Sequence, residues 1–173
     1  HDDLALLLTT SGSTGSPKLV KLTKENIKSN AESISEYLKI GCDDRAITSL
    51  PFNYSYGLSV INSHLFSGGS IILSNSSMME DKFWKSINDH SATSIAGVPY
   101  NYEMMLRLGI DNLNIQTVNK MTQAGGKLNY LKAKKVNDSL RLKGIDFYTM
   151  YGQTEATARI SYLPCGNIDK KPN

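Results

Sequence analysis

The segment from Thr9 to Lys18 concentrates residue types that can hold a polyphosphate. It contains six hydroxyl side chains, two glycines and one lysine within ten residues. Glycine lets backbone N–H groups approach a phosphate closely, hydroxyls add neutral donors, and lysine supplies a positive charge. Strand-like segments at 4–9 and 18–22 flank this loop, which a flexible Ser/Gly linker would not need. We therefore interpret it as a phosphate-binding loop, with Thr10, Ser11, Gly12, Ser13, Thr14, Gly15 and Lys18 as candidate contacts.

Two common nucleotide-binding motifs do not fit this loop. A Walker A loop requires GxxxxGK[ST], whereas only two residues separate Gly12 from Gly15, and Pro17 precedes Lys18. No GxGxxG motif joins a strand to a helix in the required way. The spacing thus disfavours both a P-loop hydrolase and a dinucleotide-binding Rossmann unit.

A second cluster, Tyr151-Gly152-Gln153-Thr154-Glu155, lies where a predicted strand ends. An exposed tyrosine there can stack on a base, a threonine can donate to a phosphate, and a glutamate can hold a hard cation such as Mg²⁺. The alternative is structural: Thr154 caps a short helix and Glu155 occupies its first turn. Taken alone, the cluster leaves both interpretations open.

Alternating strand and helix patterns predict how these clusters are positioned. After a helix capped by Thr23 that ends near Gly41, strand-like runs begin near Ala46, Ile71, Thr93, Val118 and Ile145. Helical patterns cover 56–67, 79–90, 100–108 and 129–143. This succession is typical of βα units. We expect an α/β fold with an open, mostly parallel sheet and helices on both faces, preceded by the strand-loop-strand element. Ligands bind such sheets beyond the carboxyl ends of the strands, here at 51–54, 97–100, 124–126 and 151–155.

Composition restricts the remaining classes of function. The 173 residues carry 19 Lys and Arg against 16 Asp and Glu, a net charge of +3 that predicts no nucleic-acid partner. The longest apolar run, at 4–8, is too short to span a membrane. We expect a soluble, cytoplasmic protein.

The loop from Thr10 to Lys18, taken with Tyr151-Gly152-Gln153-Thr154-Glu155, resembles the two signature motifs of the adenylate-forming superfamily. That superfamily contains acyl-CoA synthetases, luciferases and peptide-synthetase adenylation domains. The segments 50–58, 97–99 and 124–126 follow in the family's order, so the resemblance covers nearly the whole chain. It implies an enzyme that joins a carboxylic acid to AMP with release of pyrophosphate and then transfers the acyl group to a thiol.

The resemblance also implies roles for individual residues. The hydroxyl-rich loop with Lys18 would hold the β- and γ-phosphates of ATP. Gly125 and Gly126 would form a turn beside the adenine, on which Tyr151 would stack. Thr154 would contact the α-phosphate and Glu155 would bind magnesium, so that Lys18, Thr154 and Glu155 are the expected catalytic set. Gly152 and Gln153 complete the second motif. The expected acyl acceptor is CoA or the phosphopantetheine of an acyl carrier protein.

Five residues are candidates for the wall of a carboxylic-acid pocket: Tyr54, Tyr56, Gly97, Tyr100 and Tyr148. Tyr54 stands where many acyl-CoA synthetases have a histidine. A tyrosine can fill and gate a pocket but does not titrate near neutral pH. The identity of the acid therefore stays open.

The family's ribose-binding aspartate, its hinge and its C-terminal domain would all follow the second motif, and the sequence stops at Asn173. We therefore expect residues 1–173 to be a single nucleotide-binding domain, a truncated part of a larger N-terminal domain, with the C-terminal domain absent and little activity alone. The alternative is a non-catalytic module that binds a nucleotide or an acyl-adenylate.

Overall fold

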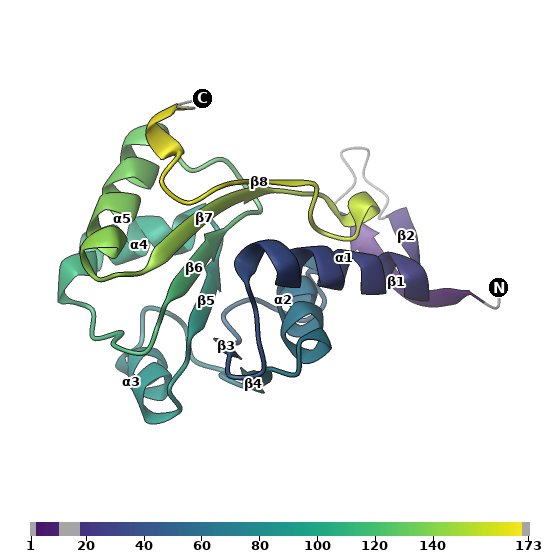
Figure 1. The fold of residues 1–173 in the computed structure, drawn as a ribbon, viewed down its shortest axis with the longest axis horizontal. Helices are drawn as coiled ribbons and strands as arrows, with labels where there is room; N and C mark the ends of the chain where they lie inside the picture. Colours follow the sequence, from purple (N-terminus) through teal and green to yellow (C-terminus); the bar gives the residue numbers. More distant parts are fainter. Residues whose placement is uncertain (1–2, 11–17, 171–173) are drawn as a thin grey trace.

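The computed structural model describes residues 3–10 and 18–170, which form a two-stranded hairpin and a six-stranded sheet with helices on both faces (Figure 1). The hairpin consists of β1 (Leu4–Thr10) and β2 (Lys18–Thr23), which pair antiparallel and bring Thr10 opposite Lys18. The phosphate-binding loop predicted from the sequence begins and ends at this pair. Residues 11–17 lie outside the described part of the chain.

The six-stranded sheet has the order β4-β3-β5-β6-β7-β8. Neighbouring strands are parallel except that β8 runs antiparallel to β7. The prediction of an open, mostly parallel sheet is confirmed. The strands are β3 (Arg45–Ile47), β4 (Ser70–Ile72), β5 (Ser94–Gly97), β6 (Lys120–Gln123), β7 (Asp146–Tyr151) and β8 (Ser161–Leu163).

The helices agree with the predicted spans to within three residues at each end, and the largest difference is at the end of the first helix, predicted near Gly41 and found at Leu38. The first begins where predicted, because Thr23 and Asn26 form a reciprocal capping box at its N-terminus. Its C-cap is Lys39, which adopts a left-handed conformation with φ of 53°. The helices are α1 (Lys24–Leu38), α2 (Ser55–Phe66), α3 (Asp81–Asp89), α4 (Pro99–Leu108) and α5 (Tyr130–Leu142), and the short 3₁₀ turns are η1 (Ile110–Asn112), η2 (Thr154–Ala156) and η3 (Ile168–Lys170). No helix in the described ranges is long and apolar enough to cross a membrane.

Alternating side chains along the central strands point to two separate cores. Ile95, Met121 and Phe147 face α3, α4 and α5 in the larger core. Their strand neighbours Ala96 and Tyr148 face α1 and α2 in the smaller one. This alternation follows from the period of two along a strand, and it places buried residues on both faces of the sheet.

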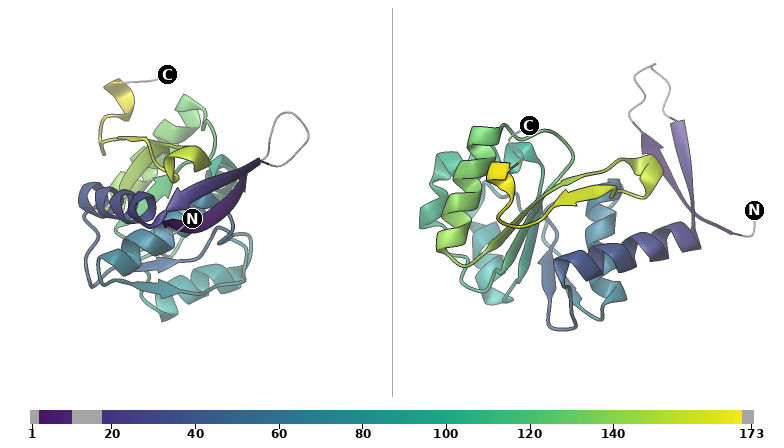
Figure 2. Two further views of the ribbon diagram at one scale, coloured as in Figure 1. Left: turned by 90° about the vertical axis from the view of Figure 1, so that its right-hand side faces the viewer. Right: turned by 45° about the horizontal axis from the view of Figure 1, so that its top comes forward.

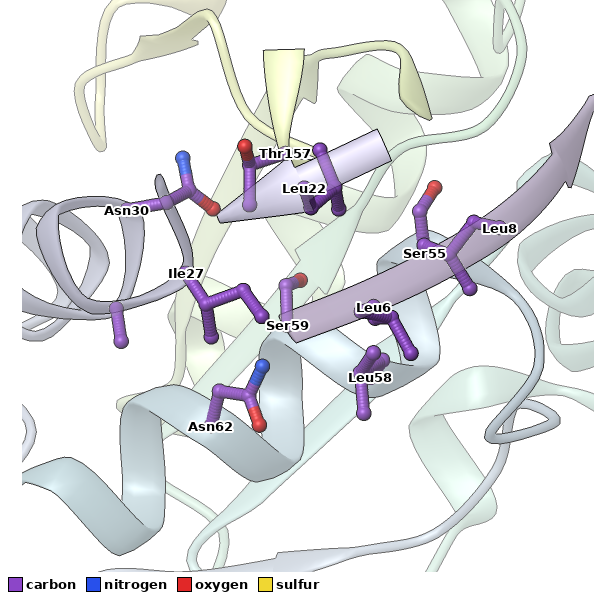
Figure 3. Close-up of a pocket in the computed structure, with 11 residues that line it drawn as sticks. Leu6, Leu8, Leu22, Ile27, Asn30, Ser55, Leu58, Ser59, Asn62 and Thr157 are labelled. Atoms are coloured by element: carbon purple, nitrogen blue, oxygen red, sulfur yellow. The ribbon is translucent and has the colours of Figure 1, made fainter. Parts of the chain in front are cut away.

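The hairpin packs at one end of the molecule, against α1 and α2 (Figure 2). Its inward-facing Leu8 and Leu22 are buried. Together with Leu6 they approach Ile27 of α1 and Leu58 of α2 (Figure 3). The residual cavity between them has a volume of about 10 Å³, which is roughly the space that one water molecule needs. Apolar packing therefore fixes the base of the hairpin, whose tip carries the predicted loop.

A buried polar cluster lies at the end of the sheet where the parallel strands begin, and it stabilises the fold there. Lys120 donates to both carboxylate oxygens of Asp44, at 2.8 and 2.9 Å, and the Thr93 hydroxyl donates to the same carboxylate at 2.7 Å. Nearby, His64 is 3% exposed, and its Nδ1 lies 2.8 Å from the Val60 carbonyl oxygen. These groups are remote from the carboxyl ends of the strands, so we assign them to stability.

Candidate nucleotide-binding cleft

A cleft of about 770 Å³ opens at the carboxyl ends of β6 and β7. Parallel sheets bind ligands at this edge, and the volume lies within the usual range for small-molecule sites. Residues of several predicted ligand segments, far apart in the sequence, line it together. They include Tyr54, Gly125, Gly126, Tyr151 and Gly152.

The turn at Gly125 and Gly126 forms one wall of the cleft. Gly125 has a φ of +78°, a conformation that favours glycine. A Cβ atom at Gly125 would lie 2.2 Å from the Tyr54 hydroxyl, and one at Gly126 would lie 3.1 Å from Cγ of Pro99. Glycine at both positions therefore lets the turn pack closely against Tyr54 and Pro99, and both glycines line the cleft.

Gln123 holds this glycine turn in place. Its side-chain amide donates to the Gly126 carbonyl oxygen at 2.8 Å, and the residue is 3% exposed. Our reading of the sequence did not single it out. The only signal in the sequence is its position as the last residue of β6, two residues before the glycine pair.

Tyr151, the last residue of β7, is 59% exposed and lines the cleft. Its ring is available to a flat aromatic ligand. Immediately after it the chain turns sharply, since a Cβ at Gly152 would lie 1.5 Å from the Ala158 carbonyl oxygen. The Tyr151 carbonyl accepts a hydrogen bond from Ile160 N–H at 2.9 Å, which closes the turn.

Thr154 and Glu155 lie in η2, on this turn. The Thr154 hydroxyl is 3.2 Å from the hydroxyl of Ser55, the first residue of α2, so the N-terminus of α2 and the second motif meet here. Gln153, an exposed residue, occupies the cap position of η2 and makes no side-chain cap hydrogen bond. Thr154 is therefore not the cap that the structural alternative required. Glu155 is exposed in the first turn of η2.

The hairpin reaches the same region, because β2 contacts η2 (Figure 1). Lys18, at the start of β2, and Glu155, in η2, thus lie on neighbouring elements. Thr10 is half-buried opposite Lys18. The remaining predicted phosphate contacts, Ser11, Gly12, Ser13, Thr14 and Gly15, fall outside the described residues.

Of the predicted acid-pocket residues, Tyr54 lines the cleft. Tyr56 is 3% exposed, and its hydroxyl donates to the Thr122 carbonyl oxygen at 2.7 Å. Burial raises the pKa of Tyr56 to about 12, so it is a neutral support behind Tyr54, whose ring it meets edge-on at 6.1 Å. Burial also raises the pKa of Tyr54.

The other three candidates lie at different places around the sheet. Gly97 ends β5 and is packed against Tyr102, whose Cε2 would lie 3.0 Å from a Cβ at that position. Tyr100 is 61% exposed on α4. Tyr148 is buried on the side of α1 and α2, and its hydroxyl donates to Asp146 at 3.4 Å, toward the start of β7. Burial, assisted by the Asp146 carboxylate, raises the pKa of Tyr148 to about 12.

In the described part of the chain, no group of three or more His, Cys, Asp and Glu side chains could hold a metal ion. The residues do fit magnesium bound with a polyphosphate. Such a cation is usually held by one or two carboxylates, with phosphate oxygens and water as its other ligands. Glu155, in η2 next to β2, can supply one carboxylate.

Comparison with known proteins agrees with this geometry. The sequence matches the family described as AMP-binding enzyme over residues 1–173. It is 28% identical over 157 residues to equisetin synthetase of Fusarium heterosporum, covering 89% of this chain and 4% of that protein. It is 28% identical over 164 residues to the acyl-CoA synthetase FUM10 of Gibberella moniliformis, covering 94% of this chain and 29% of that protein.

The fold is similar to that of O-succinylbenzoate coenzyme A synthetase from Bacillus subtilis. The structure of that enzyme in complex with AMP superimposes with a TM-score of 0.84 and 28% identity, covering 98% of this chain and 34% of that one. Its complex with ATP and a magnesium ion gives a TM-score of 0.81 and covers 95% and 33%. The chain thus spans about a third or less of the length of these relatives.

Proposed function

The chain belongs to the AMP-binding enzyme family, and we propose that it is the ATP-binding part of the N-terminal domain of an acid–thiol ligase. The intact enzyme would join a carboxylic acid to AMP, release pyrophosphate, and transfer the acyl group to a thiol. The observation that carries the proposal is the cleft, which gathers the glycine turn, Tyr54 and Tyr151 next to η2, an element that also contacts β2 of the hairpin.

Each group at the cleft has a role in binding ATP. The ring of Tyr151 stacks on the adenine, and the bare backbone of Gly125 and Gly126 lies along its edge. The hydroxyl of Thr154, supported by Ser55, donates to the α-phosphate. Lys18 and the loop that precedes it hold the β- and γ-phosphates. A magnesium ion bound at Glu155 would neutralise phosphate charge.

The reaction needs alignment and charge neutralisation rather than an acid–base pair. A carboxylate oxygen of the acid attacks the α-phosphorus of ATP, and the bond from that phosphorus to the oxygen bridging to the β-phosphate breaks. Pyrophosphate leaves with the electron pair. A donor fixed before the reaction, such as Thr154, lowers the barrier because it needs no reorganisation as charge moves, and Lys18 adds positive charge beside the leaving pyrophosphate.

The acid enters beside Tyr54, and its acyl group passes to CoA or to the phosphopantetheine of an acyl carrier protein. FUM10 is named an acyl-CoA synthetase. A related protein from Talaromyces variabilis is named a hybrid PKS-NRPS synthetase. Both names are compatible with the proposed chemistry, and they support different acceptors. The acid and the acceptor are therefore to be identified by experiment.

Residues 1–173 make up a single nucleotide-binding domain in this proposal, and the ligase needs the further sequence that the longer relatives contain. We expect the 173 residues to bind nucleotide and to catalyse adenylation poorly alone. The alternative, a non-catalytic module, predicts nucleotide binding without pyrophosphate exchange in any length of protein.

The test is exchange of labelled pyrophosphate into ATP by the full-length protein, screened against a panel of carboxylic acids. We expect exchange with at least one acid, and loss of it in Glu155→Gln. Nucleotide binding without exchange for every acid would favour the non-catalytic module. Release of inorganic phosphate from ATP in the absence of any acid would show that the reaction class is wrong.

A further inference from the structure

A positively charged side chain is buried behind the cleft. Arg159 follows the turn that carries Thr154 and Glu155, and it is 8% exposed. Within residues 3–10 and 18–170, no carboxylate lies within ion-pair distance of its guanidinium. Burying such a charge without a counter-ion is unfavourable, so other contacts must compensate for the lost solvation of the guanidinium.

The guanidinium joins two elements of the fold. One terminal nitrogen donates to the Ser59 hydroxyl of α2 at 3.2 Å, and the other donates to the Met150 sulfur of β7. Its central carbon lies over the ring of Tyr56, 4.2 Å from the centroid. Nε has no hydrogen-bond partner in the described part of the chain. The planar group is thus held by a cation–π contact and two neutral acceptors.

The backbone that Arg159 terminates is unfavourable by itself. Thr157 and Ala158 have φ values of 57° and 89°, which side-chain-bearing residues rarely adopt. Their N–H groups bond to the carbonyls of Thr154 and Gln153, each at 3.1 Å. Strained conformations of this kind persist only where surrounding contacts hold them.

One face of α2 contacts both ends of this turn. Ser55 and Ser59 are four residues apart and therefore share a side of the helix (Figure 3). The first hydroxyl is 3.2 Å from the hydroxyl of Thr154, and the second accepts from Arg159. At the far end, the Asn30 amide of α1 donates to the Arg159 carbonyl oxygen at 3.3 Å.

We propose that Arg159 is a positioning residue that clamps the turn from Gly152 to Arg159 onto α2 and thereby fixes Thr154 and Glu155 at the cleft. This inference rests on the proposed function for the roles of those two residues. Arg159 acts through the turn and touches no reacting atom. Loss of the clamp lets the turn move, so that Thr154 and Glu155 sample positions outside the productive geometry.

The test uses Arg159→Met, which keeps most of the length of the side chain and removes its donors, in the full-length protein. Hydrogen exchange is measured without nucleotide at the amides of residues 156–158. Pyrophosphate exchange is measured as a function of Mg²⁺ and of the acid. We expect faster amide exchange and about a tenfold higher Mg²⁺ concentration at half-maximal rate, as for loss of residues that orient a metal ligand. The KM for the acid should stay within about twofold of the wild-type value, because the turn that Arg159 holds is not proposed to bind the acid.

The matched control is Ile87→Val, which removes one methylene from a fully buried residue of α3 in the other core. It should lower the melting temperature without changing amide exchange at residues 156–158 or the Mg²⁺ dependence of pyrophosphate exchange. If Arg159→Met behaves like Ile87→Val in both, Arg159 is merely a structural residue and the proposal is wrong. If Arg159→Met fails to fold, Ser59→Ala replaces it, and the same two readouts decide.

A double-mutant cycle with Thr154→Val tests whether Arg159 acts through the turn. We expect the effects of the two substitutions on the rate of pyrophosphate exchange to be strongly non-additive. Once Thr154→Val has removed the hydroxyl, its displacement by Arg159→Met can cause no further loss. Full additivity would overturn the proposal. Absence of pyrophosphate exchange in the wild-type protein would count against the proposed function instead. Amide hydrogen exchange in Arg159→Met would still decide whether Arg159 holds the turn.

Discussion

Tyr54 and Gly125 are in direct contact across the wall of the cleft, so close that a Cβ on Gly125 would lie 2.2 Å from the Tyr54 hydroxyl. One residue comes from the loop before α2 and the other follows β6. The side chain expected to close the acid pocket is therefore fitted to the backbone expected to border the adenine. A substitution of either residue should therefore change the binding of both the acid and the nucleotide.

Gly125→Ala should weaken nucleotide binding, because the new methyl group must displace Tyr54 into the cleft. Gly144→Ala is the matched control: Gly144 has a similar φ of +73°, but nothing lies within 4 Å of its would-be Cβ. Both variants should lose about 1 kcal/mol of stability from the unfavourable φ. Only Gly125→Ala should lower the affinity for ATP, measured by calorimetry. Equal affinities in the two variants would show that the contact with Tyr54 does not shape the site.

Thr154→Val should slow pyrophosphate exchange by about a hundredfold, the usual loss for one donor aimed at developing negative charge. Valine keeps the shape and removes the hydroxyl that lies 3.2 Å from Ser55. Thr154→Ser keeps the donor and should stay within about a few-fold of the wild-type rate, since its hydroxyl can rotate to the same partner. A serine variant as slow as the valine variant would mean that the methyl group, and not the hydroxyl, is needed.

Regular patterns in the sequence predicted most of the fold. The capping box at Thr23 and the strand-like runs are local signals, and the helices they delimit agree with the structure to within three residues. The antiparallel strand β8 was missed, because Ser161–Leu163 is short and shows no alternating burial. Its place is set by pairing with β7, which is a long-range interaction.

The candidate site was predictable to the extent that it rests on motifs. Glycine pairs and the Tyr151–Glu155 cluster are visible as residue types, and the cleft gathers Gly125, Gly126, Tyr151 and Gly152. The supporting residues were not visible. Arg159 acts through contacts with Ser59 and Met150 that form only after the chain has folded, and the hydrogen bond from Gln123 to Gly126 likewise depends on the shape of the glycine turn. The burial of Tyr56 beneath Arg159 likewise depends on how α2 packs on the sheet.

Lys120→Met should destabilise the protein by about 3–5 kcal/mol, the usual cost of leaving one partner of a buried ion pair alone. The side chains of Lys120 and Asp44 are 10% and 11% exposed. Burial by itself raises the pKa of Asp44, but the hydrogen bonds from Lys120, Gly41 and Thr93 outweigh it and hold the pKa below its usual value. Denaturant unfolding measures the loss. Lys85→Met is the control, because its ion pair with Asp89 is exposed and should contribute less than about 1 kcal/mol.

The stability of the protein should fall as the pH drops below 6.5, and His64 should be one cause. Burial lowers the pKa of His64 in the folded protein from its ordinary value of 6.5, despite the raising effects of the Val60 carbonyl and of Asp44. Its Nδ1–H donates to Val60, so neutral Nε2 accepts from the Ser94 hydroxyl at 2.9 Å.

In the unfolded chain the His64 ring is protonated below about pH 6.5, whereas the folded state keeps it neutral to a lower pH. The unfolded state therefore binds more protons in that window, and the free energy of unfolding decreases with falling pH. Urea unfolding between about pH 7.5 and about pH 5, within the range in which histidine titrates, should show a shallower pH dependence in His64→Gln than in the wild type. His90→Gln, which alters an exposed ring, should retain the wild-type slope, and an equal slope in His64→Gln would show that His64 does not contribute.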